Sequence, residues 1–296
     1  MSETPRYYVP HSSVWPIVGS VALFLTAFGA ASLIHQSTAK VAGEAHFGFA
    51  APVFYTGLAV LALMMFGWFG TVIRESLQGL VSRQLDRSYR MGMLWFIVSE
   101  VMFFAAFFGA LFYARMISVP WLAGAGGKLE THLILWPDFA DTWPLFMTPG
   151  GTASEAMQAW GLPFINTVIL VTSSGTITFA HWALKRNHRF GLKLWLGVTI
   201  ALGICFLTLQ AIEYSHAWRE LGLSLGSGIY GSTFFMLTGF HGSHVTLGVI
   251  MMTIMMLRVL RGHFTPENHF AFEATSWYWH FVDVIWLFLF TFVYWF

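Results

Sequence analysis

The 296-residue chain is poor in cysteine and in charged side chains. Its one cysteine, Cys205, cannot form a disulfide within the chain, and it cannot supply a copper centre that needs two thiolates. Charged residues make up 10% of the sequence against 56% hydrophobic ones, and the mean hydropathy is +0.64. So few charges cannot cover the surface of a water-soluble protein, and the composition therefore predicts an integral membrane protein.

Long apolar segments follow one another along the whole sequence. A helix needs about 20 apolar residues to cross about 30 Å of hydrocarbon, and open strands cannot satisfy their backbone groups in lipid. The sequence therefore predicts an all-α integral membrane protein with seven transmembrane helices. Their expected ranges are 14–34, 47–73, 91–114, 162–184, 194–212, 229–257 and 274–296.

Lysine and arginine are distributed unevenly between the two ends of these spans. If the N-terminus is cytoplasmic, all but four of the 15 lysines and arginines, including Arg6, fall on the cytoplasmic side. The four exceptions are Lys40, Arg115, Lys128 and Arg219. Because positively charged loops stay cytoplasmic, we expect the N-terminus inside and, with an odd number of spans, the C-terminus outside.

Two connecting segments organise the chain. The charged connector 76–90 separates an N-terminal part (1–75, the tail and the first two helices) from the remaining five helices (91–296). The long segment 119–158 is rich in glycine, proline and tryptophan. Because tryptophan favours the membrane interface, we expect this loop to cap the outer surface.

Two acidic side chains, Glu100 and Asp283, lie inside predicted spans. Glu100 lies about 14 Å along the third helix from its start, and Asp283 lies at a similar depth in the last one. An ionisable group at this depth is costly in free energy. The two acids could form the coupling site of a proton or ion transporter, or each could be neutral or hydrogen-bonded to a neighbouring helix. Both interpretations stay open.

His241 and His244 lie three residues apart on one helix, a spacing that allows two imidazoles to meet one metal. A membrane oxidase with a diiron centre would use such a pair, but it needs further histidine motifs. The small residues beside these histidines favour close helix packing with hydrogen bonds across the contact. Gln210 and Glu213 are expected to form inter-helix hydrogen bonds in the same way.

Long motifs in five regions of the sequence resemble one family. These motifs are 92–104 (GMLWFIVSEVMFF), 162–167 with 174–176, 210–214 (QAIEY), 230–244 (YGSTFFMLTGFHGSH) and 269–283 (HFAFEATSWYWHFVD). They resemble, in the same order, subunit III of the bacterial heme-copper (aa3-type) cytochrome c oxidases. Motifs of this length in the right order are far more specific than a short pattern.

The resemblance implies a non-catalytic partner subunit in the bacterial cytoplasmic (inner) membrane. Its helices would form a V of two against five, with phospholipids held in the cleft. The chain would have no catalytic residue, metal or redox cofactor, since hemes and copper belong to the partner subunits I and II. It would bind no nucleic acid. The complex would reduce O2 to water and pump protons, and this subunit would support proton uptake and turnover.

The resemblance also assigns residues to the lipid cleft. Glu100 matches the intramembrane glutamate of the family, and the other matching positions are Trp68, Arg74, Glu75, Arg90, His269 and Glu273. Leu80 and Val81 stand where the family usually has histidines beside a lipid headgroup. Two alternatives remain: an ion-coupled transporter, or a subunit III-like component of a quinol oxidase or nitric oxide reductase.

Overall fold

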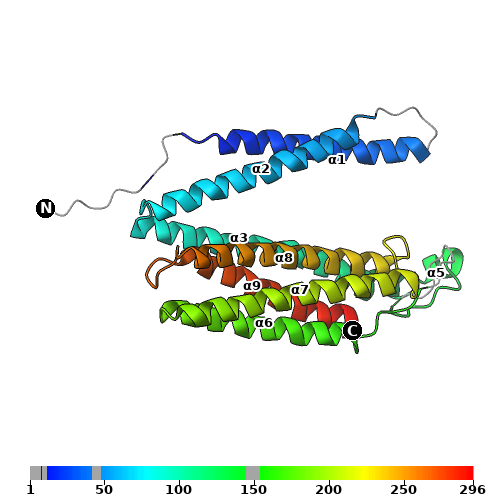
Figure 1. Cartoon of the computed structure of the whole chain (residues 1–296). Helices are drawn as coiled ribbons and strands as arrows, with labels where there is room; N and C mark the ends of the chain where they lie inside the picture. The colour runs from blue at the N-terminus through cyan, green and yellow to red at the C-terminus, as the bar shows by residue number, and fades with distance from the viewer. Residues whose placement is uncertain (1–7, 9–11, 42–47, 145–153, 296) are drawn as a thin grey trace. The chain divides into compact units, whose positions relative to one another are not determined.

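The computed structural model describes residues 8, 12–41, 48–144 and 154–295. This part of the chain consists of helices and their connections and contains no strand (Figure 1). Some sequence predictions lie outside the described residues: the position of Arg6, the two span ends at Phe47 and Phe296, and the middle of the long loop, 145–153. The chain divides into two compact units, Met1–Tyr89 and Arg90–Phe296.

Among the described residues, seven helices are long and apolar enough to cross a membrane, which confirms the predicted all-α, multi-pass fold. The main helices are α1 (Trp15–Val41), α2 (Ala50–Leu77), α3 (Arg83–Tyr113), α6 (Leu162–Lys185), α7 (Arg189–Arg219), α8 (Ile229–Leu260) and α9 (Phe270–Leu289). The π-helical turn η1 (Ala114–Ser118) and α4 (Val119–Leu122) continue α3, and the π-helical η2 (Phe290–Trp295) continues α9. The short helix α5 (Leu129–Leu135) lies in the long connection.

Several helices extend beyond the predicted spans. Helix α3 begins at Arg83, within the predicted connector, and α7 runs from Arg189 to Arg219 where only 194–212 was expected. The prediction counted apolar residues only. Arginine, lysine, glutamate and glutamine are nevertheless good helix formers, and their charged groups can reach the water at the ends of a span.

In the first unit, α1 packs along α2 through glycines. A Cβ atom added at Gly29 would lie 2.5 Å from the backbone of Phe54, and one added at Gly57 would lie 2.5 Å from the backbone nitrogen of Thr26. Larger residues would push the two backbones apart. Small residues at such contacts let helices approach closely in lipid, so these glycines fix the α1–α2 pair.

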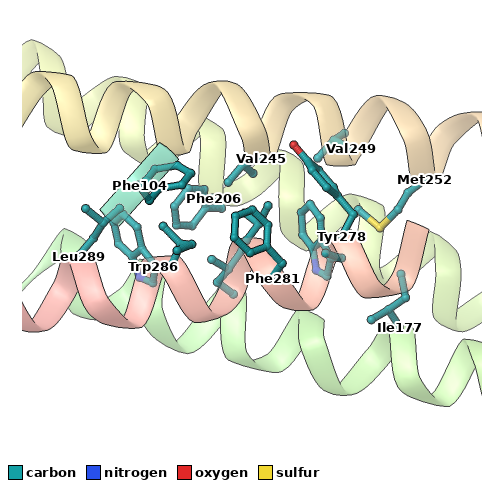
Figure 2. Packing of buried hydrophobic residues seen from close by; sticks show 14 of the residues in the cluster. Phe104, Ile177, Phe206, Val245, Val249, Met252, Tyr278, Phe281, Trp286 and Leu289 are labelled. Carbon is teal, nitrogen blue, oxygen red and sulfur yellow. The ribbon is translucent and has the colours of Figure 1, made fainter. Parts of the chain in front are cut away.

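In the second unit, α6, α7, α8 and α9 enclose an apolar core to which α3 contributes Phe104. Figure 2 shows Phe281 and Trp286 of α9 pointing into this core beside Phe206 of α7 and Val245 of α8.

The fully buried Trp279 connects all four of these helices. From α9 it packs against Gly203 of α7 and Gly248 of α8, where an added Cβ would lie 3.0 Å and 2.7 Å from its ring. Its indole Nε1 donates a hydrogen bond to Ser173 Oγ of α6 at 3.0 Å. The large ring of Trp279 thus fits because α7 and α8 have glycine, which carries no side chain, at the two positions that it contacts.

A tight turn joins α6 to α7. Asn187 has a φ of 56°, a left-handed conformation that asparagine tolerates better than most residues. The next residue, His188, caps α7, because its Nδ1 accepts a hydrogen bond from Gly191 N at 3.1 Å. This turn keeps the end of α6 and the start of α7 together at one end of the second unit.

Candidate functional site

The intramembrane Glu100 is paired with His244. Its Oε2 lies 2.8 Å from His244 Nε2, which joins α3 to α8. The exposed fractions of the two side chains are 21% and 12%, so both are largely covered by protein. On the other side of the imidazole ring, His244 Nδ1 lies 2.6 Å from the carbonyl oxygen of Phe240. The histidine therefore bridges a carboxyl group and a backbone carbonyl.

This geometry fixes the number of protons on the pair. A carbonyl oxygen can only accept, so His244 Nδ1 carries a proton and donates it to Phe240. One further proton must lie between His244 Nε2 and Glu100, either on the carboxyl group or on the imidazole. In the first case both groups are neutral, and in the second they form an ion pair. The pair has no net charge in either case, which reduces the cost of placing a carboxyl group at this depth.

Aromatic side chains surround the pair. The ring of Phe104 lies 5.0 Å from that of His244 in an edge-on arrangement. Tyr278 OH donates a hydrogen bond to the backbone oxygen of His244 at 3.3 Å. These contacts come from α3 and α9, so the ring and the backbone of His244 are held from two neighbouring helices. The Glu100–His244 bond is thus a polar contact between α3 and α8 that is enclosed by aromatic side chains.

Asp283 lies in a separate polar group. It is 5% exposed, and its Oδ2 lies 4.0 Å from His280 Nδ1. That nitrogen also lies 2.7 Å from Ser174 Oγ of α6. Among the described residues, no contact joins Asp283 to Glu100. The two acids that the transporter hypothesis would combine thus have different partners.

Within the described ranges of the chain, the side chains of His241 and His244 have different hydrogen-bond partners. It is fully buried, its Nε2 lies 3.2 Å from the carbonyl oxygen of Val282 in α9, and its ring lies 5.1 Å from that of Trp286. The two histidines of the motif therefore bond to different helices.

Gln210 and Glu213 also bond across helices. Gln210 Nε2 donates to the backbone oxygen of Thr238 at 3.0 Å, which connects α7 to α8. Tyr294 OH donates to Glu213 Oε1 at 2.6 Å, which connects the end of the chain to α7. Both bonds are buried.

At one end of the second unit, Arg90 and Glu273 form an ion pair with an N–O distance of 2.8 Å. The guanidinium of Arg90 also lies 5.2 Å from the ring centre of Phe270. His269 comes immediately before α9, and its carbonyl oxygen accepts a hydrogen bond from the Glu273 amide at 3.1 Å. Two residues that the sequence assigned separately, Arg90 and Glu273, are thus direct partners that join α3 to α9.

In the first unit, Trp68, Arg74 and Glu75 lie toward the end of α2. Trp68 is 45% exposed. Arg74 is exposed and donates to its own helix, to Thr71 Oγ1 at 3.3 Å. Glu75 Oε1 accepts a hydrogen bond from Tyr8 OH at 3.2 Å. The arginine is therefore held along the helix by a neighbouring hydroxyl group.

Sequence reasoning missed one contact at the end of the second unit. His181, near the end of α6, lies beside His269, with ring centres 5.4 Å apart. The two histidines are far apart in the sequence, and no spacing rule connects them. Only the packing of α6 against α9 brings them together.

Comparison with known proteins gives consistent matches over nearly the whole chain. The family model described as cytochrome c oxidase subunit III matches residues 5–296. Cytochrome c oxidase subunit 3 of Oryctolagus cuniculus is 36% identical over 294 residues, which cover 99% of this chain and 98% of the relative. The proteins of the same description from Dugong dugon and Pongo abelii are 37% and 38% identical over 295 and 294 residues, with the same coverage.

Proposed function

Because the chain belongs to the cytochrome c oxidase subunit III family, we propose that it is a non-catalytic core subunit of a respiratory oxidase. In this proposal the complex reduces O2 to water and pumps protons, and the partner subunits I and II hold the hemes and copper. This chain holds structural phospholipids beside the catalytic subunit. It thereby supports proton uptake and the lifetime of the complex during turnover.

The observation that carries the lipid-binding role is an arginine next to an exposed apolar helix face, which occurs in both units. Arg74 lies beyond Phe66 and Trp68 on α2, which are 71% and 45% exposed. Arg90 lies before Leu94 and Trp95 on α3, which are 49% and 64% exposed. A guanidinium binds phosphate through several N–H groups, and lipid acyl chains would cover the apolar face beyond it.

The ion pair of Arg90 with Glu273 is compatible with this role. A guanidinium has five N–H donors, so it can bind a carboxylate and a phosphate oxygen together. The Glu100–His244 pair also fits an apolar setting, because it places no net charge toward acyl chains.

We place the chain in the inner membrane of a bacterium with its N-terminus in the cytoplasm. Arginine or lysine lies at the start of α3, the end of α6, the start of α7 and the end of α8. In successive antiparallel helices these ends share one side, and the positive-inside rule makes that side cytoplasmic. The bacterial setting is supported by the resemblance of the motifs alone.

Arg74→Ala is expected to remove at least one tightly bound phospholipid from the oxidase complex and to shorten its active lifetime during turnover. Within the part of the chain that the structure describes, Arg74 donates only to its own helix, so this change leaves no buried partner there without a hydrogen bond. Native mass spectrometry of the complex in mild detergent would count the lipids, and oxygen consumption over time would give the lifetime.

Arg90→Ala is also expected to lower the number of bound phospholipids and to shorten the active lifetime. Arg219→Ala is the matched control, because Arg219 is an exposed arginine at the other end of the spans. An unchanged lipid count in both Arg74→Ala and Arg90→Ala would contradict the lipid-binding role.

A further inference from the structure

Three metal-ligating side chains meet where α6 ends and α9 begins. His181 comes from the last turns of α6, His269 precedes α9, and Glu273 lies in the first turn of α9. One ligand atom from each residue can be chosen so that all three lie within 4.8 Å of one another. All three residues belong to the second unit, in which α6 packs against α9 (Figure 1).

Two ring nitrogens in this group are buried and lack a hydrogen-bond partner within the described chain. They are His181 Nε2 and His269 Nδ1. A buried nitrogen without a partner loses the hydrogen bond that water would give it. Buried polar groups are nearly always satisfied, and an exception calls for an explanation such as an ion. A metal ion bound to the nitrogen lone pairs would satisfy both atoms at once.

The third ligand is held in place by Arg90. Glu273 Oε2 lies 2.8 Å from a guanidinium nitrogen of Arg90. A carboxylate has two oxygens, so Glu273 can keep this ion pair and still bind a metal. Ligating side chains in metal sites usually have a hydrogen-bonded partner that orients them. Arg90 therefore acts as a positioning residue, although its positive charge lowers the affinity for a cation.

The ligand types indicate which metal fits. Calcium and magnesium prefer oxygen ligands throughout, whereas imidazole suits zinc and other transition metals. Two histidines and one glutamate are a known zinc ligand set that leaves the fourth position to water. We infer that His181, His269 and Glu273 form a binding site for a divalent transition metal ion, for which Zn²⁺ is the best fit. The site depends only on contacts within the second unit and does not rest on the proposed function.

Zinc titration of the full chain in mild detergent tests this inference. The chain is first stripped with a chelator, and bound Zn²⁺ is then counted at rising free Zn²⁺. We expect the wild type to bind one Zn²⁺. The affinity for Zn²⁺ is expected to be at least tenfold lower in His181→Ala and in Glu273→Gln. X-ray absorption at the zinc edge is expected to report two imidazoles in the wild type. The bound ion is also expected to raise the temperature of thermal unfolding, since it links α6 to α9.

His263→Ala is the matched control. His263 lies in the loop before α9, and burial together with the nearby Arg258 and Arg261 lowers its pKa, so it is a neutral imidazole outside the cluster. This variant is expected to bind Zn²⁺ like the wild type. His181→Cys keeps a metal ligand and is expected to retain the ion, now with one sulfur neighbour in the absorption spectrum, even if His181→Ala fails to fold. Equal Zn²⁺ binding by the wild type and Glu273→Gln, or His181→Cys without a zinc–sulfur signal, would overturn the inference.

Discussion

Replacing Trp279 by alanine is expected to destabilise the second unit by about 3–5 kcal/mol, the range for truncating a large buried aromatic side chain. Trp279 is fully buried and contacts α6, α7 and α8. Its removal creates a cavity that neighbours cannot fill, because Gly203 and Gly248 have no side chains to move into it. The hydrogen bond to Ser173 Oγ is lost as well.

Thermal unfolding of the full chain in mild detergent, followed by circular dichroism, would measure this effect. Trp279→Phe is expected to lose less stability, because a phenyl ring fills part of the same space. The matched control is Trp218→Ala, since Trp218 is 70% exposed. If Trp279→Ala unfolded at the same temperature as Trp218→Ala, the packing described for the core would be wrong.

Breaking the Glu100–His244 pair is expected to give the second large effect. Glu100→Leu leaves His244 Nε2 without a hydrogen-bond donor, and His244→Leu leaves the carboxyl group of Glu100 without a partner. Each change should cost about 1–3 kcal/mol, the penalty for a buried polar group left unsatisfied. In the double variant neither group remains. Its cost should therefore be smaller than the sum of the two single costs, by about 0.5–3 kcal/mol.

A conservative variant tests whether the pair can be uncharged. In Glu100→Gln the amide N–H can donate to His244 Nε2 while Nδ1 keeps its bond to Phe240. We expect nearly wild-type stability for this variant. Thr246→Val on α8 is the control, because the hydroxyl group of Thr246 is exposed and donates a hydrogen bond to the Gly242 carbonyl oxygen of its own helix. Additive costs in the double-mutant cycle would show that the two groups do not interact.

The sequence was sufficient to predict the number, type and approximate positions of the spans. Hydropathy alone locates the segments that cross the hydrocarbon layer. It could not predict that α3 begins at Arg83, because charged residues end the apolar run without ending the helix. The boundary between the hydrocarbon layer and the water thus falls within α3 and not at its first residue.

The partners of the polar groups could not be read from the sequence. The sequence marks Glu100 as unusual, but finding His244 as its partner requires knowing which faces of α3 and α8 meet. The same holds for His181, which meets His269 only because α6 packs against α9. Trp279 gives a third example, since its space exists only where Gly203 and Gly248 come together from different helices.

Isolation of the complex from native membranes tests the central claim most directly. The full chain would be affinity-tagged and purified in mild detergent, and the absorption spectrum of the product would be recorded. The proposed function predicts that heme absorbance accompanies the chain in constant proportion and separates from it in harsher detergent. Recovery of the chain as a stable protein with no heme-bearing partner would contradict it.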